Sequence, residues 1–188
     1  MKTDIRHYAK HFKGFVDSKL CDTLVEEMKT IEFNQHKFHD NLTNELKTRS
    51  GSQELSISWD DCPSRSILSK KLWYVIHDYL KYINLPWFVS WSGYTPPRFN
   101  KYDQDKKMAL HCDHIHSMFD GERRGIPILS ILGALNDDYE GGEFIMFEDT
   151  DIKLYKGDVL VFPSVFLYPH KVEPVKSGTR YSYISWAW

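Results

Sequence analysis

Two segments in the first half of the chain carry apolar residues at helical spacing. In FVDSKLCDTLVEEMKT, residues 15–30, they recur four positions apart. In SRSILSKKLWYVIHDYLKYI, residues 64–83, they form a wide stripe of the kind that a helix buries against a flat surface. The apolar positions are Leu20, Leu24 and Met28 in the first segment and Ile67, Leu68, Leu72, Val75, Ile76, Tyr79 and Ile83 in the second. The side chains placed to cap the helix starts are Asp17 or Ser18 and Ser64 or Ser66. Both segments are predicted to be amphipathic helices.

The remainder of the chain lacks this spacing. Residues 34–56 are polar and poorly periodic, which predicts a long loop with a turn at Ser50–Gly51. After Pro86, short segments rich in β-branched and aromatic residues alternate with turn residues. These segments are residues 88–94, 98–102, 108–113, 126–135, 143–147, 152–155, 159–162, 170–175 and 180–186. Many short strands with frequent turns are typical of an antiparallel sandwich or barrel.

The predicted fold class is therefore mainly β with flanking helices. We expect a single domain over residues 1–188, with a helical buttress over about 1–85 and a β core over about 86–188. The chain has 24 basic and 26 acidic residues and no block of like charge, so nothing indicates nucleic acid or an anionic membrane as a partner.

The N-terminal MKTDIRHYAKHF lacks the apolar core of a signal peptide, and no run approaches the roughly 18 apolar residues of a membrane span. The three cysteines are odd in number and widely spaced, as in reduced intracellular proteins. We therefore expect a cytoplasmic protein. The oligomeric state is not indicated.

Candidate metal chemistry is concentrated in LHCDHIH, residues 110–116. Residues two apart on a strand project from one face, so a strand through this segment would turn His111 and Asp113 the same way. His170, at another expected strand start, is the natural third ligand. Two histidines and one carboxylate leave coordination positions open and suit ferrous iron, although zinc accepts the same donors.

Other readings of the segment remain open. The histidines and acid could form a structural hydrogen-bond network or lie on a surface loop. His114 and His116 are expected to be loop residues near the mouth of the site, and Cys112 a small buried apolar residue.

A second candidate site lies in SGTRYSYISWAW, residues 177–188, on the expected strand over 180–186. Arg180 and Ser182 stand two apart, so one face would present a guanidinium and a hydroxyl. A buried arginine needs a partner, which a ligand carboxylate could supply. The alternative is an internal salt bridge to a residue such as Asp103 or Glu143.

Five motifs in this order resemble the iron(II)/2-oxoglutarate-dependent dioxygenases, in particular their prolyl 4-hydroxylase-like branch. They are RFNKY at 98–102, His-x-Asp at 111–113, LNDDYEGGEF at 135–144, KGDVLVFPSVFLYPHKVEPV at 156–175 and Arg-x-Ser at 180–182. The resemblance implies a double-stranded β-helix, which is a jelly-roll or cupin-like barrel. One departure is Ala134, where many relatives place a tyrosine that helps to hold 2-oxoglutarate. Ser130 could supply a hydroxyl instead.

The resemblance also implies roles for six residues. It assigns His111, Asp113 and His170 to Fe(II) and Arg180 to the distal carboxylate of 2-oxoglutarate. Tyr102 would lie close to the cosubstrate or serve as a wall aromatic, and Ser182 would support Arg180. Dioxygen is the second cosubstrate, and ascorbate is a further candidate cofactor.

The implied reaction is hydroxylation of an unactivated C–H bond, with succinate and carbon dioxide as coproducts. A proline-containing peptide or protein is favoured as the substrate over a small molecule. An aromatic rim around the mouth, with Trp87, Trp91, Tyr94 and Phe99, would suit a peptide, although these residues could equally be core. The alternatives are a non-catalytic cupin-type metal-binding module and a zinc hydrolase, for which Glu143 is the only suggestive base.

Overall fold

The computed structural model describes residues 2–40, 43, 45–48, 53–88, 91–113 and 127–188. Within these ranges the chain forms a 3-10 turn η1 (Ile5–Tyr8) and the helices α1 (Ser18–Met28) and α2 (Arg65–Ile83). The strands of the first 111 residues are β1 (Lys10–Phe12), β2 (Asn34–Gln35), β3 (Phe38–Asp40), β4 (Glu45–Lys47), β5 (Ser56–Ser58), β6 (Arg98–Tyr102) and β7 (Met108–His111). The later strands are β8 (Leu129–Ala134), β9 (Glu140–Gly141), β10 (Phe144–Met146), β11 (Thr150–Asp151), β12 (Val159–Pro163), β13 (His170–Val172), β14 (Val175–Ser177) and β15 (Arg180–Ala187).

Both predicted helices are present, and their starts are capped in different ways. The Asp17 side chain accepts a hydrogen bond from the Leu20 amide at 2.9 Å, as the sequence predicts. Ser64 precedes α2 but makes no side-chain cap of its own. Instead the Glu27 carboxylate accepts hydrogen bonds from the Ser64 amide at 2.9 Å and from its hydroxyl at 2.8 Å. The end of α1 is thereby tied to the start of α2.

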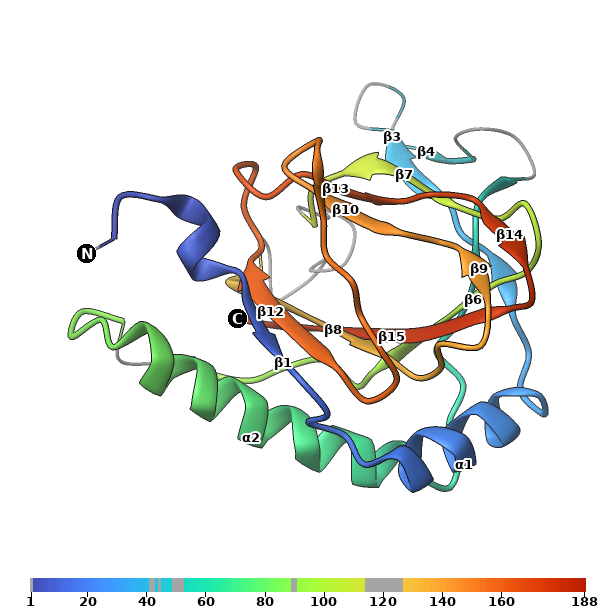
Figure 1. Ribbon diagram of the computed structural model, residues 1–188, viewed down its shortest axis with the longest axis horizontal. Helices are drawn as coiled ribbons and strands as arrows, with labels where there is room; N and C mark the ends of the chain where they lie inside the picture. Colours follow the sequence, from blue (N-terminus) through green and yellow to red (C-terminus); the bar gives the residue numbers. More distant parts are fainter. Residues whose placement is uncertain (1, 41–42, 44, 49–52, 89–90, 114–126) are drawn as a thin grey trace.

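A seven-stranded sheet in the order β1-β12-β8-β15-β6-β5-β2 forms the larger layer of the molecule. Both helices lie along one face of it (Figure 1). Alternation along each strand sends side chains to opposite faces, so Ile131 of β8 packs in the helix-side core and Leu132 in the core on the other face. Gly133 leaves room for the Tyr183 ring, because a Cβ there would lie 2.1 Å from Cζ of that ring.

A four-stranded sheet in the order β11-β10-β13-β7 faces the larger sheet (Figure 1). The second core fills the space between the two sheets. Its most buried side chains include Met146, Leu160, Phe162, Val175 and Trp186. Two facing sheets flanked by two helices confirm the predicted mainly β class.

Three expectations about individual segments were wrong. Residues 34–56 contain β2, β3, β4 and the start of β5 rather than one loop, and β1, β2 and β5 join the larger sheet. The first 85 residues are therefore more than a helical buttress. Strands of two or three residues are too short to show alternation, and their pairing comes from backbone hydrogen bonds.

Two of the expected later strands also differ. The described residues of 88–94 form only an isolated bridge, from Tyr94 to Ala187. Residues 152–155 follow the short strand β11 and form no strand themselves. The turn expected at Ser50–Gly51 falls outside the described residues.

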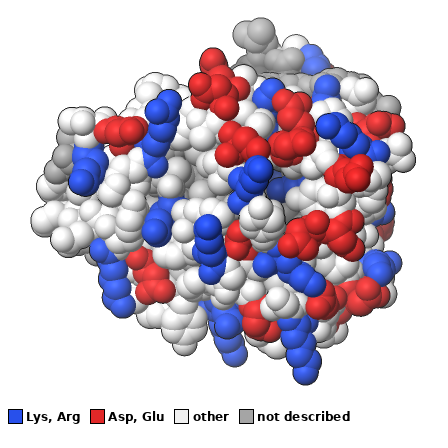
Figure 2. Space-filling view, viewed as in Figure 1, with Lys and Arg blue, Asp and Glu red and all other residues white. Residues whose placement is uncertain are grey.

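The surface viewed in Figure 2 carries lysines and arginines interspersed with aspartates and glutamates. In the ranges that the structure describes, no helix has both the length and the hydrophobicity needed to cross a bilayer.

Candidate metal centre

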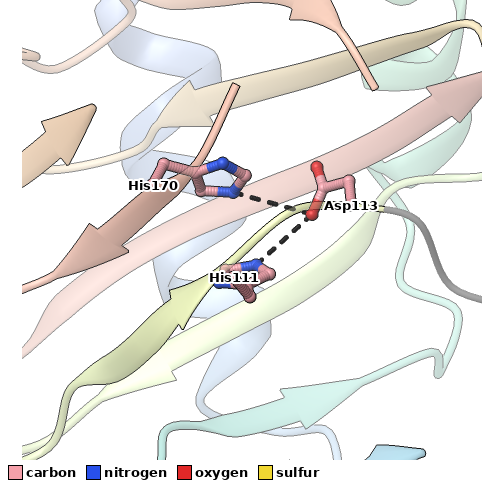
Figure 3. A group of neighbouring side chains, drawn as sticks. All are labelled: His111, Asp113 and His170. Atoms are coloured by element: carbon pink, nitrogen blue, oxygen red, sulfur yellow. Dashed lines mark ion pairs between the residues drawn. The ribbon is translucent and has the colours of Figure 1, made fainter. Parts of the chain in front are cut away.

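Three side chains from β7, β13 and the residues after β7 meet inside the barrel (Figure 3). Antiparallel pairing of β7 with β13 places His111 directly opposite His170. The strand β7 ends at His111, so the expectation that it continues through Asp113 was wrong. Asp113, two residues after the end of β7, nevertheless places its carboxylate beside the two imidazoles. The structure therefore brings together the three residues that the sequence singled out.

The geometry of these three residues is compact. The Oδ1 atom of Asp113 lies 3.3 Å from Nε2 of His111 and 3.6 Å from Nε2 of His170. One candidate ligand atom from each residue lies within 4.8 Å of the others. Asp113 and His170 are each 3% exposed. The spacing and burial suit a shared ion that is shielded from bulk water.

The outer nitrogens of both imidazoles are already engaged. Nδ1 of His111 lies 2.8 Å from the Ala109 carbonyl oxygen, and Nδ1 of His170 lies 3.0 Å from the Tyr168 carbonyl oxygen. A carbonyl oxygen only accepts, so each Nδ1 carries the proton and donates it. In the neutral rings both Nε2 lone pairs then face the Asp113 carboxylate. A cation between them relieves that repulsion, and this arrangement of backbone partners is the usual one for histidine ligands.

The electrostatics of the group point the same way. Burial alone would raise the pKa of Asp113, but His170 and His111 outweigh it and hold that pKa well below its ordinary range. Burial lowers the pKa of His111, and the neighbouring His170 lowers it further. Burial also opposes protonation of His170, yet the Asp113 carboxylate raises the pKa of His170 above its ordinary value. The Oδ2 atom of Asp113 is buried without a hydrogen-bond partner. The pocket is therefore arranged for positive charge.

Arg180 lies inside the same barrel and is 1% exposed. Its Nη1 donates to the Ser182 hydroxyl at 3.0 Å, and its guanidinium carbon lies 4.9 Å from the centre of the Tyr102 ring. Within the described residues Arg180 makes no ion pair, and its Nε has no hydrogen-bond partner. Asp103, one of the two alternative partners, instead pairs with Lys101 at 3.2 Å. Arg180 therefore retains hydrogen-bonding capacity for an anionic ligand.

A cleft of about 260 Å³ reaches Arg180 from the surface. Its walls include Tyr139, Gly142, Glu143 and Phe144. Glu143, the other alternative partner of Arg180, thus lies on the same cleft. Phe144 also contacts the His170 ring, with 5.4 Å between ring centres. Phe144 therefore lines the cleft beside Arg180 and also contacts the metal-type group, which is formed by His111, Asp113 and His170.

Several smaller expectations can be compared with the structure. Ser130, considered as a substitute for the missing tyrosine at Ala134, pairs its hydroxyl with that of Ser164 at 2.6 Å. Cys112 is only partly buried, which corrects its expected place in the core, because β7 ends at the preceding residue. His114 and His116 lie outside the described residues.

The aromatic rim expected around the mouth was wrong in large part. Phe99 is fully buried in the helix-side core, and Trp91 and Tyr94 pack against that core. Phe99 of β6 faces the helices rather than the metal-type group, and the Tyr94 hydroxyl donates to the Ser69 carbonyl oxygen of α2 at 3.0 Å. Only Trp87, which is 64% exposed, lies on the surface.

Sequence reasoning missed Arg98. It lies at the start of β6, is 6% exposed, and shares the inward face of that strand with Asn100 and Tyr102. Its guanidinium carbon lies 5.1 Å from the centre of the Trp186 ring. The available signal was the period-two spacing of Arg98 from Tyr102.

Comparison with known proteins fits this geometry. The family model of the 2OG-Fe(II) oxygenase superfamily matches residues 97–188, which contain all three members of the metal-type group and Arg180. This match covers 92 of the 188 residues of the chain. The superfamily's name specifies Fe(II) and 2-oxoglutarate, and the donor set of His111, Asp113 and His170 fits that metal.

Proteins with sequences similar to this chain include PKHD-type hydroxylases. The protein from Stenotrophomonas maltophilia (strain R551-3) is 37% identical over 99 residues, covering 50% of this chain and 43% of the relative. The protein from Delftia acidovorans is 37% identical over 98 residues, covering 48% of this chain and 42% of the relative. The chain thus spans less than half the length of these relatives.

Solved structures of prolyl hydroxylases resemble this chain over nearly its whole length. A Pseudomonas putida prolyl-4-hydroxylase aligns with a TM-score of 0.67 and 20% identity, covering 96% of this chain and 92% of its own. A prolyl hydroxylase from Trichoplax adhaerens, in complex with a hypoxia inducible factor peptide fragment, aligns with a TM-score of 0.70 and 17% identity, covering 97% and 84%. The viral collagen prolyl hydroxylase of Paramecium Bursaria Chlorella virus-1 aligns with a TM-score of 0.67 and 16% identity, covering 96% and 94%. These likenesses confirm the predicted double-stranded β-helix.

Proposed function

We propose that this chain is an Fe(II)- and 2-oxoglutarate-dependent dioxygenase that hydroxylates an unactivated C–H bond, with succinate and carbon dioxide as coproducts. The observation that carries the proposal is the buried group of His111, Asp113 and His170, in which both Nε2 atoms and a carboxylate converge on one point. When bound, Fe(II) with 2-oxoglutarate and dioxygen supplies the oxidising chemistry.

The three proposed ligands hold the ion from a rigid base. His111 and His170 are fixed by strand pairing and by their Nδ1 hydrogen bonds to backbone carbonyls. Asp113 adds the negative charge that favours a divalent cation. Two histidines and one carboxylate occupy one side of the ion and leave the other side for the cosubstrate and dioxygen.

Arg180 is the proposed anchor for the distal carboxylate of 2-oxoglutarate. Its guanidinium is buried without an acidic partner in the described residues, and a carboxylate would satisfy it in bidentate geometry. Ser182 holds one edge of the guanidinium, and the Tyr102 ring supports its face. These side chains orient the cosubstrate, and the surrounding core excludes bulk water.

For the substrate we propose a proline-containing peptide or protein. The support is the fold shared with prolyl hydroxylases, one of which was solved with a peptide. We further propose that the chain acts as one domain and without a membrane or nucleic-acid partner. Ascorbate is proposed only as a reductant that sustains turnover.

The test is succinate formation from 2-oxoglutarate by the purified protein loaded with Fe(II). We expect succinate above a matched preparation loaded with Zn(II), which binds the same donors but is redox-inactive. Adding proline-containing peptides should raise the rate and increase the mass of a peptide by one oxygen atom. A protein that binds Fe(II) yet forms no succinate, with or without peptides, would instead be a non-catalytic metal-binding module.

A further inference from the structure

A second buried arginine enters the barrel beside the proposed active site. Arg98 on β6 lies opposite Ile184 of β15, and Tyr102 on the same strand lies opposite Arg180. Both arginines therefore enter the same interior from adjacent strands. Four residues of strand separate the two positions, which corresponds to about 13 Å at the usual rise per residue.

The hydrogen-bonding capacity of Arg98 is largely unused by the described residues. Its Nε donates to Asn100 Oδ1 at 3.1 Å, and neither terminal nitrogen has a described protein partner. Its planar face lies on the Trp186 ring, a neutral partner. Burial lowers the pKa of Arg98 to about 10, so the group stays charged at neutral pH. Arg98 forms no ion pair with a described residue, and a buried charge without such a pair is costly unless a ligand compensates it.

Trp186 adds a second unused donor at the same place. It is 1% exposed, and its Nε1 is buried without a hydrogen-bond partner. Trp59, 43% exposed, packs against Trp186 with 6.3 Å between ring centres. An aromatic wall thus leads from the surface to Arg98. A carboxylate at its inner end could accept from Arg98 and from Trp186.

We propose that Arg98, with Trp186, binds a carboxylate of the primary substrate and selects acidic peptides. The inference rests on the proposed function and names the substrate class of the same site. The carboxylate can belong to an Asp or Glu side chain near the reacting residue or to a peptide C-terminus. Arg98 is thus a specificity-determining residue, and Arg180 serves the cosubstrate.

The test uses protein loaded with Mn(II) and 2-oxoglutarate, which binds ligands without turnover. The probes are pentapeptides with a central proline and randomised flanks, in one pool with both termini blocked and one with a free C-terminus. Retained peptides are identified by mass spectrometry. Wild type should retain peptides with Asp or Glu flanks, or with a free C-terminus, about tenfold more tightly than their Asn, Gln or amide counterparts. The pool that shows the preference identifies the source of the carboxylate.

Three variants separate Arg98 from its surroundings. R98Q should reduce the preference for acidic peptides to within about twofold while leaving the 2-oxoglutarate affinity unchanged. R98K keeps the charge but lacks the planar fork, so it should retain part of the preference and serves if R98Q folds poorly. W186F keeps an aromatic face but removes the Nε1 donor, and it should lower the preference by a smaller factor.

Other results would overturn the inference. Wild type without preference for a carboxylate, or a folded R98Q protein that keeps the preference, would remove Arg98 from substrate recognition. A tenfold loss of 2-oxoglutarate affinity in R98Q with unchanged peptide selection would assign Arg98 to the cosubstrate. Succinate formation by the Fe(II) protein without peptide is measured separately. Its failure would count against the oxygenase activity while the Mn(II) binding result still stands.

Discussion

Arg180 and Tyr102 face each other across the β15–β6 pair, with the guanidinium carbon 4.9 Å from the centre of the phenol ring. The ring covers one face of a cation that burial has removed from water. Replacing Tyr102 with Leu removes this support and should weaken 2-oxoglutarate binding about three- to tenfold. Titration of 2-oxoglutarate into the Mn(II) protein measures the change. The matched control is Tyr102→Phe, which keeps the ring; an equal loss in both variants would assign the effect to the hydroxyl.

Replacing Arg180 with Gln should remove the charged partner proposed for the distal carboxylate of 2-oxoglutarate. We expect the dissociation constant for 2-oxoglutarate to rise about 100-fold, because a buried charge-assisted pair is lost, while metal affinity stays within about twofold. The 2-oxoglutarate affinity of Arg180→Lys should lie between those of wild type and Arg180→Gln, since a lysine supplies charge without bidentate geometry. Parallel titrations with metal and with 2-oxoglutarate check this. Unchanged cosubstrate affinity would place the anchor elsewhere.

Replacing Asp113 with Ala should remove the one negative charge from the metal-type group. Affinity for Fe(II) or Mn(II) should fall by about 100-fold or more. The melting temperature of the metal-free protein should change by only about 3 °C, because the carboxylate has one oxygen without a partner and little packing is lost. Metal titration followed by thermal unfolding measures both. Asp113→Asn is the shape-matched control and should lose metal as well; retained affinity in both would show that the carboxylate is not a ligand.

Asp158, which is not part of the proposed active site, should contribute to the stability of the folded chain. Its carboxylate accepts from the Gly14 amide at 2.7 Å, from the Tyr155 amide at 3.0 Å and from His11 Nε2 at 2.8 Å, and it joins the N-terminal segment to the turn before β12. Asp158→Asn should lower the free energy of unfolding by about 2–3 kcal/mol at neutral pH. Denaturant unfolding measures the difference, with the exposed Asp22→Asn as the control.

The difference in the free energy of unfolding between wild type and Asp158→Asn should depend on pH. Burial opposes ionisation of Asp158, but the backbone amides of Tyr155 and Gly14, with His11, lower its pKa below the ordinary value of 3.8. A carboxyl whose folded pKa is depressed contributes stability above its unfolded pKa and loses it as the pH falls through the folded value. The gap between wild type and Asp158→Asn should therefore persist down to about pH 4 and shrink below it. A gap that widens in acid would contradict this assignment.

The parts of the molecule that were predicted correctly carry a local signal. The stripes of α1 and α2 follow the helical period, and His111 and Asp113 are close in sequence. His170 was singled out as an isolated histidine at an expected strand start, and Arg180 as a charged residue in an apolar, aromatic strand; the family resemblance then gave both of them expected roles. A sequence pattern cannot show which distant residues contact one another in the folded chain. Glu27 caps α2 from another helix, and this depends on tertiary contact.

Arg98 shows the same limit at the site itself. Read along the chain, it is the first residue of an aromatic strand and looks like any surface arginine. Only the barrel shows that its side chain is buried on Trp186, which follows 88 residues later. The short strands β2–β5 were missed because edge pairing of two or three residues leaves no periodicity to read.

The order of the larger sheet has a consequence for how the protein reaches its folded state. Every pair of neighbouring strands in it closes a long loop: even β5 and β6, which are consecutive strands, are separated by residues 59–97. Such a topology costs chain entropy before any contact compensates it, so folding should be slow for a chain of this size. The two histidines opposite each other on β7 and β13 are 59 residues apart in the chain, so their meeting also depends on long-range pairing. A metal ion bound there would join two strands that are distant in sequence and would stabilise the folded barrel.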